Sequence, residues 1–164
     1  MKNKMENKTG KIMGHVKYVG RDASGKIIYK HEHNKELGEH NTVCDLYYDL
    51  MADLLAGGTD DIIAYGHAGT GTGGVATDTN LITHCDELRT AIDSITQGAG
   101  ADAHKIVVVF TLGAGVCTAA LTECGLFVAA AQATADMMLY DDSLVYTKPA
   151  GGTLEVTWTI THEN

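Results

Sequence analysis

Residues 153–161 read TLEVTWTIT, and this stretch decides the fold class. Leu, Val, Trp and Ile at positions 154, 156, 158 and 160 alternate with Glu or Thr. Strict alternation is typical of a β-strand with one face in the core and the other face outside. We therefore expect Trp158 to lie in the core.

Further strand signals lie at residues 15–20, 26–30, 61–66, 89–97, 105–112, 125–129 and 137–140. The first two flank an Asp- and Gly-containing turn, which is typical of a hairpin. A second hairpin is expected where the fourth and fifth flank a Gly-rich turn at 98–102. The IVVVF run at 106–110 is β-branched and aromatic, which favours a covered strand.

One helix is expected, at residues 41–56, because its apolar residues follow the i, i+3, i+4, i+7 spacing. Thr42 and Asp45 come close to a capping box, and two glycines at 57 and 58 end the segment. Residues 31–40 are polar and are expected to form a loop.

These signals predict a mainly β chain with one helix, arranged as an antiparallel β-sandwich or barrel-like domain with an extended N-terminal arm. Residues 1–12 are polar and charged and predict a flexible basic arm. Residues 13–164 are expected to form a single domain, because 164 residues suit one hydrophobic core.

Charge is distributed unevenly along a chain whose net charge is −9. Residues 1–35 carry a net charge of +6, and residues 36–164 carry −15. An acidic body repels phosphates, so we expect no nucleic-acid partner. No apolar run is long enough to span a membrane, and no apolar signal segment opens the chain. Four cysteines without a CxxC pair are expected to be buried free thiols.

Residues 106–147 contain no Lys or Arg. One interpretation is a surface that another subunit covers. The other is a central sheet buried within one domain.

Motifs for chemistry are weak. Glycines at 69, 71 and 74 fit G-x-G-x-x-G, but a poor helix start follows them, so a bent surface loop at 67–80 is the preferred interpretation. The histidines at 31, 33 and 40, and the His84–Cys85 neighbours, do not supply the four spaced ligands of a structural zinc site. No nucleophile elbow is present, and the paired carboxylates lie in expected turns. We expect no enzymatic activity, no metal and no cofactor.

An ordered set of motifs does resemble a known family. AYGHAGTGT at 64–72 is followed by TDTNL at 77–81 and ELR at 87–89, then by LTECGLF at 121–127, ML at 138–139 and the closing TLEVTWTI at 153–160. This order resembles a group of tailed-bacteriophage virion structural proteins over residues 60–162. The chain departs from their pattern at Leu121 and Cys124, at the glycines before the last strand, and at residues 140–142.

The resemblance implies a non-enzymatic virion protein. The preferred role is a capsid decoration (cement) protein that is assembled in the bacterial host cytoplasm, lies on the capsid surface as a homotrimer and binds the major capsid protein. A tail-fibre or baseplate connector is the alternative, and a small soluble ligand-binding domain that uses the 67–80 loop is a second one.

With this role come residue expectations. The shell-binding arm would use Lys2, Lys4, Lys8, Lys11 and Lys17. The subunit interface would use Val107, Val109, Leu126, Phe127, Met137 and Leu139. Glu123 is expected to accept hydrogen bonds from the backbone or from Arg89, with an Arg89–Glu123 pair as the specific prediction. Gly125 is expected to permit close backbone approach. With Trp158, these residues would be structural.

Overall fold

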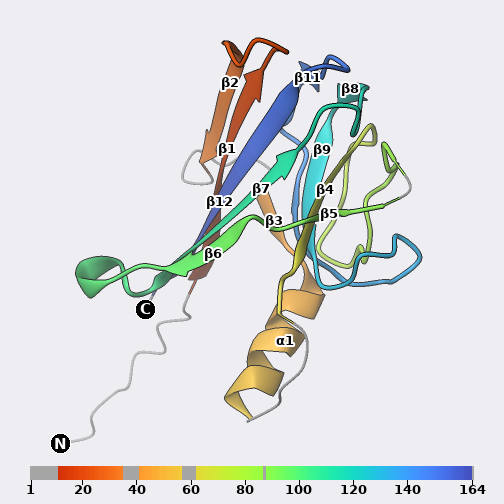
Figure 1. The fold of residues 1–164 in the computed structure, drawn as a ribbon. Helices are drawn as coiled ribbons and strands as arrows, with labels where there is room; N and C mark the ends of the chain where they lie inside the picture. Colours follow the sequence, from red (N-terminus) through yellow and green to blue (C-terminus); the bar gives the residue numbers. More distant parts are fainter. Residues whose placement is uncertain (1–10, 35–40, 57–61, 87, 164) are drawn as a thin grey trace, which may run out of the picture.

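The computed structural model describes residues 11–34, 41–56, 62–86 and 88–163, which form two facing antiparallel sheets (Figure 1). Sheet A has the order β2-β1-β12-β7-β6. Its strands are β1 (Lys11–Arg21), β2 (Ile27–Asn34), β6 (Ser94–Gln97), β7 (Lys105–Leu112) and β12 (Thr153–Glu163). A short 3-10 helix, η2 (Gly100–Asp102), lies in the turn between β6 and β7.

Sheet B has the order β3-β10-β9-β4-β5. Its strands are β3 (Asn41–Val43), β4 (Tyr65–Gly69), β5 (Thr90–Ala91), β9 (Glu123–Phe127) and β10 (Met137–Asp141). A separate pair joins β8 (Ala120–Leu121) to β11 (Tyr146–Thr147). The predicted mainly β sandwich with one α-helix, α1 (Asp45–Leu55), is therefore confirmed, and the described strands form no closed barrel.

The central strand of sheet A is β12, which pairs with β1 on one side and β7 on the other. Its alternation places Leu154, Val156, Trp158 and Ile160 in the core, all fully buried. The prediction for Trp158 is confirmed. Its neighbours across the ladders, Val16 and Val108, are also buried, so a continuous apolar layer forms between the sheets.

Strands β9 and β10 are buried along their whole length, unlike β12. Their inner side chains, such as Leu126 and Leu139, belong to the main core. Their outer side chains, such as Phe127 and Met137, form a second cluster with Leu81, because the segment after β4 packs over this face. β9 and β10 belong to the segment 106–147, which lacks Lys and Arg. In these two strands, the lack of Lys and Arg therefore follows from burial within the chain itself.

Several predicted boundaries were wrong. The strand expected at residues 89–97 is two short strands, β5 in sheet B and β6 in sheet A, because the chain crosses between the sheets at residues 92–93. Residues 41–43 form β3, and the helix begins at Asp45 with Cys44 as N-cap, so Thr42 makes no capping box. The strand expected at 61–66 is β4, which begins at Tyr65. The polar segment after residue 30 continues β2 to Asn34, because ladder pairing with β1 outweighs its polar composition.

Residues 11 and 12, which were predicted to belong to a flexible arm, lie in β1. Lys11 opens β1, and Lys17 lies within it, so these two residues belong to sheet A. Lys2, Lys4 and Lys8 lie outside the described residues.

Candidate functional site

Glu123 fastens the glycine-rich loop onto sheet B. This fully buried carboxylate accepts hydrogen bonds from the backbone amides of Gly71 (2.9 Å), Ile82 (3.0 Å) and Thr83 (2.8 Å). These contacts satisfy the charge without a cation, so the predicted pair with Arg89 was wrong. The Gly71 amide, which a phosphate would need, is thereby engaged within the chain.

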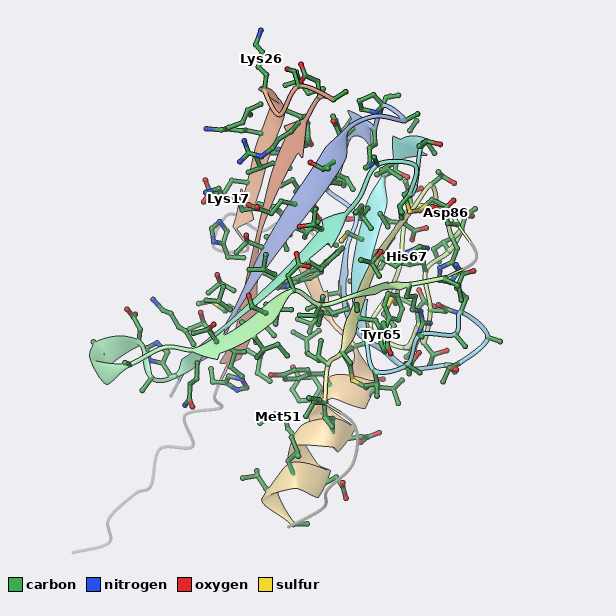
Figure 2. All side chains as sticks on the ribbon, in the orientation of Figure 1. Lys17, Lys26, Met51, Tyr65, His67 and Asp86 are labelled. Carbon is green, nitrogen blue, oxygen red and sulfur yellow. A yellow bond between two sulfur atoms is a disulfide. The ribbon has the colours of Figure 1, made fainter. Side chains whose placement is uncertain are left out.

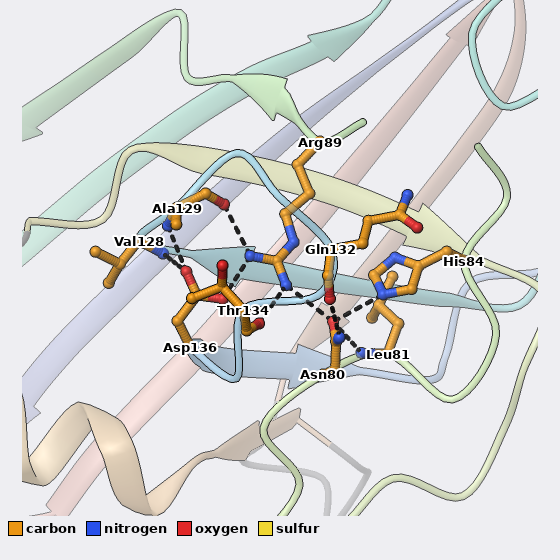
Figure 3. Close-up of polar contacts among 9 residues, drawn as sticks. All are labelled: Asn80, Leu81, His84, Arg89, Val128, Ala129, Gln132, Thr134 and Asp136. Atoms are coloured by element: carbon orange, nitrogen blue, oxygen red, sulfur yellow. Dashed lines mark hydrogen bonds and ion pairs between the residues drawn. The ribbon is translucent and has the colours of Figure 1, made fainter. Parts of the chain in front are cut away.

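Arg89 instead pairs with Asp136, in a node that ties together two loops, the one between β4 and β5 and the one between β9 and β10 (Figure 3). Its guanidinium donates to Asp136 Oδ1 (2.5 Å), Asn80 Oδ1 (2.9 Å) and the carbonyls of Ala129 (2.8 Å) and Thr134 (3.1 Å). The Arg89 Cζ lies 3.7 Å from the centroid of the Phe127 ring. Burial lowers the pKa of Arg89 and the neighbouring Asp136 opposes that shift. The node is structural, because nearly all its polar atoms bind one another.

Gly125 fulfils its predicted role. A Cβ built there would lie 3.0 Å from the Phe127 ring and 3.2 Å from the Leu139 carbonyl oxygen. The backbone of β9 thus approaches its neighbours so closely that a Cβ would require them to shift by a few tenths of an ångström.

A buried polar cluster connects the two sheets. Asp141 of β10 contacts His33 Nδ1 at 2.6 Å and accepts hydrogen bonds from the Tyr18 hydroxyl and from Ser143 (2.8 Å). Burial, followed by the charges of Cys124 and Asp141, raises the pKa of Tyr18 well above its ordinary value. The His33 and Asp141 side chains are fully buried. This carboxylate–imidazole pair therefore fixes how the sheets meet.

Sulfur and imidazole groups gather beside β4. Cys85 and Cys117 form a disulfide, so the prediction of four free thiols was wrong for this pair and right for the buried Cys44 and Cys124. His67 Nε2 lies 3.8 Å from the Cys85 sulfur. Burial and the neighbouring His84 lower the pKa of His67 to about 4.

Four of the predicted interface residues lie inside the protomer. Leu126, Phe127, Met137 and Leu139 are fully buried by the chain's own core, so they cannot form an intersubunit surface. Val107 and Val109 are different. They alternate with the buried Val108, lie on the outer face of sheet A and are only partly buried.

The outer face of sheet A also carries Lys17. A shallow depression of about 210 Å³ is lined by Lys17, Tyr18, Lys30, His31 and Glu32. Its charged groups include both signs, so this depression has no strong preference for an anion or a cation. Figure 2 places Lys17 on the flank of the molecule opposite His67.

Among the described helices and strands, the most exposed large apolar side chain lies on α1, which projects beyond the two sheets (Figure 1). Its first turn packs inward through the buried Tyr47, whose hydroxyl lies 2.9 Å from His162 Nε2. Exposure rises along the helix, to 40% for Leu54 and 85% for Leu55. The helical spacing predicted the buried stripe but not that the tip would extend past the core.

Neither the partner of Arg89 nor the Asp141 cluster was expected from the sequence. Arg89 and Asp136 are 47 positions apart, and His33 and Asp141 are 108 apart. For Asp136 the only available signal was a single acidic residue in an apolar stretch, since an isolated carboxylate there needs a buried partner. Asp141, one of the paired carboxylates expected in turns, instead lies buried at the end of β10.

Comparisons with known proteins yield no match among protein-family models, curated proteins or solved structures. Among the described residues, no helix has the length and apolar character needed to cross a membrane.

Proposed function

We propose that this chain is a non-enzymatic structural protein of a tailed-bacteriophage virion, a capsid decoration protein that binds the outer shell as a homotrimer and stabilises it. The observation that carries the proposal is the projecting apolar tip of α1. Leu54 and Leu55, at the end of the helix, are 40% and 85% exposed. Large apolar side chains exposed together are typical of surfaces that a partner covers.

The position of this tip supports an assembly role. The Tyr47–His162 contact holds the start of α1 against the end of β12, and Lys11 of β1 pairs with Glu163 in the same ladder. The start of β1 therefore lies at the same end of the sandwich as the helix (Figure 1). The basic residues 1–10 thus precede a strand that begins at the same end of the sandwich as α1. We assign this end to contacts with neighbouring copies and with the major capsid protein.

The internal use of polar groups favours a scaffold. The Glu123 carboxylate, the Arg89 guanidinium and the Asp141 carboxylate each bind groups of the same chain. Such a molecule holds its shape through its own contacts and offers surfaces for assembly, as a lattice component requires.

The oligomer is tested first. Light scattering on the purified chain should give three times its 17.4 kDa mass. Leu55→Glu should shift the mass to that of one chain, because a charge would be buried at the interface. Val145→Glu is the matched control, since Val145 is 75% exposed but adjoins β11 at the other end of the sandwich. A monomeric wild-type chain would remove the homotrimer from the proposal.

The location is tested on virions. A gold-labelled antibody against the chain, imaged by negative stain, should label the whole shell. Label confined to the tail would replace decoration with a tail-fibre or baseplate connector, and particles without label would refute both roles.

A further inference from the structure

The cluster beside β4 brings three ligand-bearing residues together from separate segments. His67 belongs to β4, Cys85 to the loop after it, and Cys117 to the loop between β7 and β8. One nitrogen or sulfur atom from each lies within 4.8 Å of the other two. His67 and Cys117 are fully buried, and Cys85 is half-buried, so the site lies just beneath the surface.

These distances suit a tetrahedral metal ion. Zinc binds thiolate sulfur at about 2.3 Å and imidazole nitrogen at about 2.0–2.1 Å, which places neighbouring ligand atoms roughly 3.6–3.8 Å apart. His67 Nε2 lies 3.8 Å from the Cys85 sulfur, so these two ligands already have the required separation. Reduction would let the two sulfurs move from the roughly 2 Å of a disulfide bond to about 3.8 Å.

We propose that the reduced chain binds one zinc ion through His67, Cys85 and Cys117, with water as the fourth ligand. A dithiol reductant first breaks the sulfur–sulfur bond: each sulfur gains an electron and a proton, and the reductant becomes a disulfide. Zinc then replaces the two thiol protons, which are released to solvent.

The surroundings favour this chemistry. The Gln132 side-chain nitrogen lies 3.3 Å from His67 Nε2, and the ion would displace it. Asp86 stays outside the ligand set, because its carboxylate accepts the Cys117 amide hydrogen and so orients that loop. Figure 2 places His67 and Asp86 on the same flank.

The site gives the fold a cross-link in both redox states. When oxidised, a covalent bond joins the Cys85 loop to the Cys117 loop. When reduced, the ion joins the same two loops and adds β4 through His67. The loop that covers sheet B thus stays attached to the Cys117 loop in reducing surroundings as well, where the disulfide is broken.

The test uses the full chain and zinc alone. The protein is reduced with a dithiol, desalted without oxygen and titrated with zinc against a chromogenic chelator. We expect one zinc per reduced chain and none per oxidised chain. Cobalt(II) in place of zinc should give thiolate charge-transfer absorption, which reports sulfur ligation independently.

Variants then separate this site from other thiols. Cys117→Ser and His67→Gln should each weaken zinc binding by more than the roughly 10–100-fold that loss of an outer-shell partner costs. Cys44→Ser is the matched control, since Cys44 is a buried free thiol outside the cluster. Thermal unfolding of oxidised His67→Gln checks its fold, and Cys117→Ser remains informative should that variant unfold.

Three results would overturn the proposal. They are no stoichiometric zinc on the reduced wild-type chain, unchanged affinity in folded His67→Gln, and an equal loss of affinity in Cys44→Ser.

Discussion

Replacing Arg89 by Ala tests the node that ties the loops over sheet B. The substitution removes hydrogen bonds to Asp136, to Asn80 and to the carbonyls of Ala129 and Thr134, and the stacking on Phe127. The Arg89 side chain is fully buried and that of Asp136 is 10% exposed, so little water reaches the charge left behind.

The expected loss follows from this burial. Removing one partner of a buried ion pair costs about 3–5 kcal/mol. Asp136 Oδ2 keeps the hydrogen bond from the Val128 amide (3.1 Å) and the one from the Ala129 amide, which places the loss near the lower end of the range, at about 3 kcal/mol. Arg89→Lys keeps the charge but not the fork of donors, so its loss should be intermediate.

Urea unfolding at pH 7 measures the difference. The control is Lys105→Ala, which removes the exposed i,i+3 pair with Asp102 and should leave stability unchanged. A loss for Arg89→Ala no greater than that of the control would show that the node contributes no stability, contrary to the reasoning above.

Three further substitutions probe the core. Burial raises the pKa of Cys44 from 9.0 to about 12, so only the unfolded state ionises between these values and stability should fall as pH rises. From pH 8 to 10 this group should remove about 1 kcal/mol, and urea titrations of Cys44→Ala should lack that part of the decline. Trp158→Ala should cost about 3–5 kcal/mol in chemical denaturation, because it empties the centre of the core; a negligible loss would contradict its burial. Gly66→Ala should cost about 1–3 kcal/mol because its Cβ would overlap the Phe110 ring, whereas Gly113→Ala, with open space around its Cβ, should unfold at the wild-type temperature or above it.

Alternation in a sequence predicts a strand well where one face meets solvent. β12 has this pattern, and its core residues were expected correctly. β9 and β10 lack it because the chain covers both of their faces. Their mostly apolar composition was equally consistent with a subunit interface. In the structure, a segment from a distant part of the chain covers them instead.

The spacing of residues in the sequence did not predict which groups pair with the buried charges. Arg89 was expected to pair with Glu123. Backbone amides donate hydrogen bonds to that carboxylate instead, and Arg89 pairs with Asp136. The Cys85–Cys117 disulfide spans 32 positions without a paired-cysteine motif. Both outcomes depend on loop paths, which local propensity does not determine.

The order of strands in sheet A has a consequence for how the protein is made. β12 lies between β1 and β7, yet it is synthesised after all the other strands of sheet A. Until residue 163 has been synthesised, β1 and β7 have no partner between them and their ladder edges stay open. Sheet A therefore completes only after translation of β12, and its central pairings form after the outer ones.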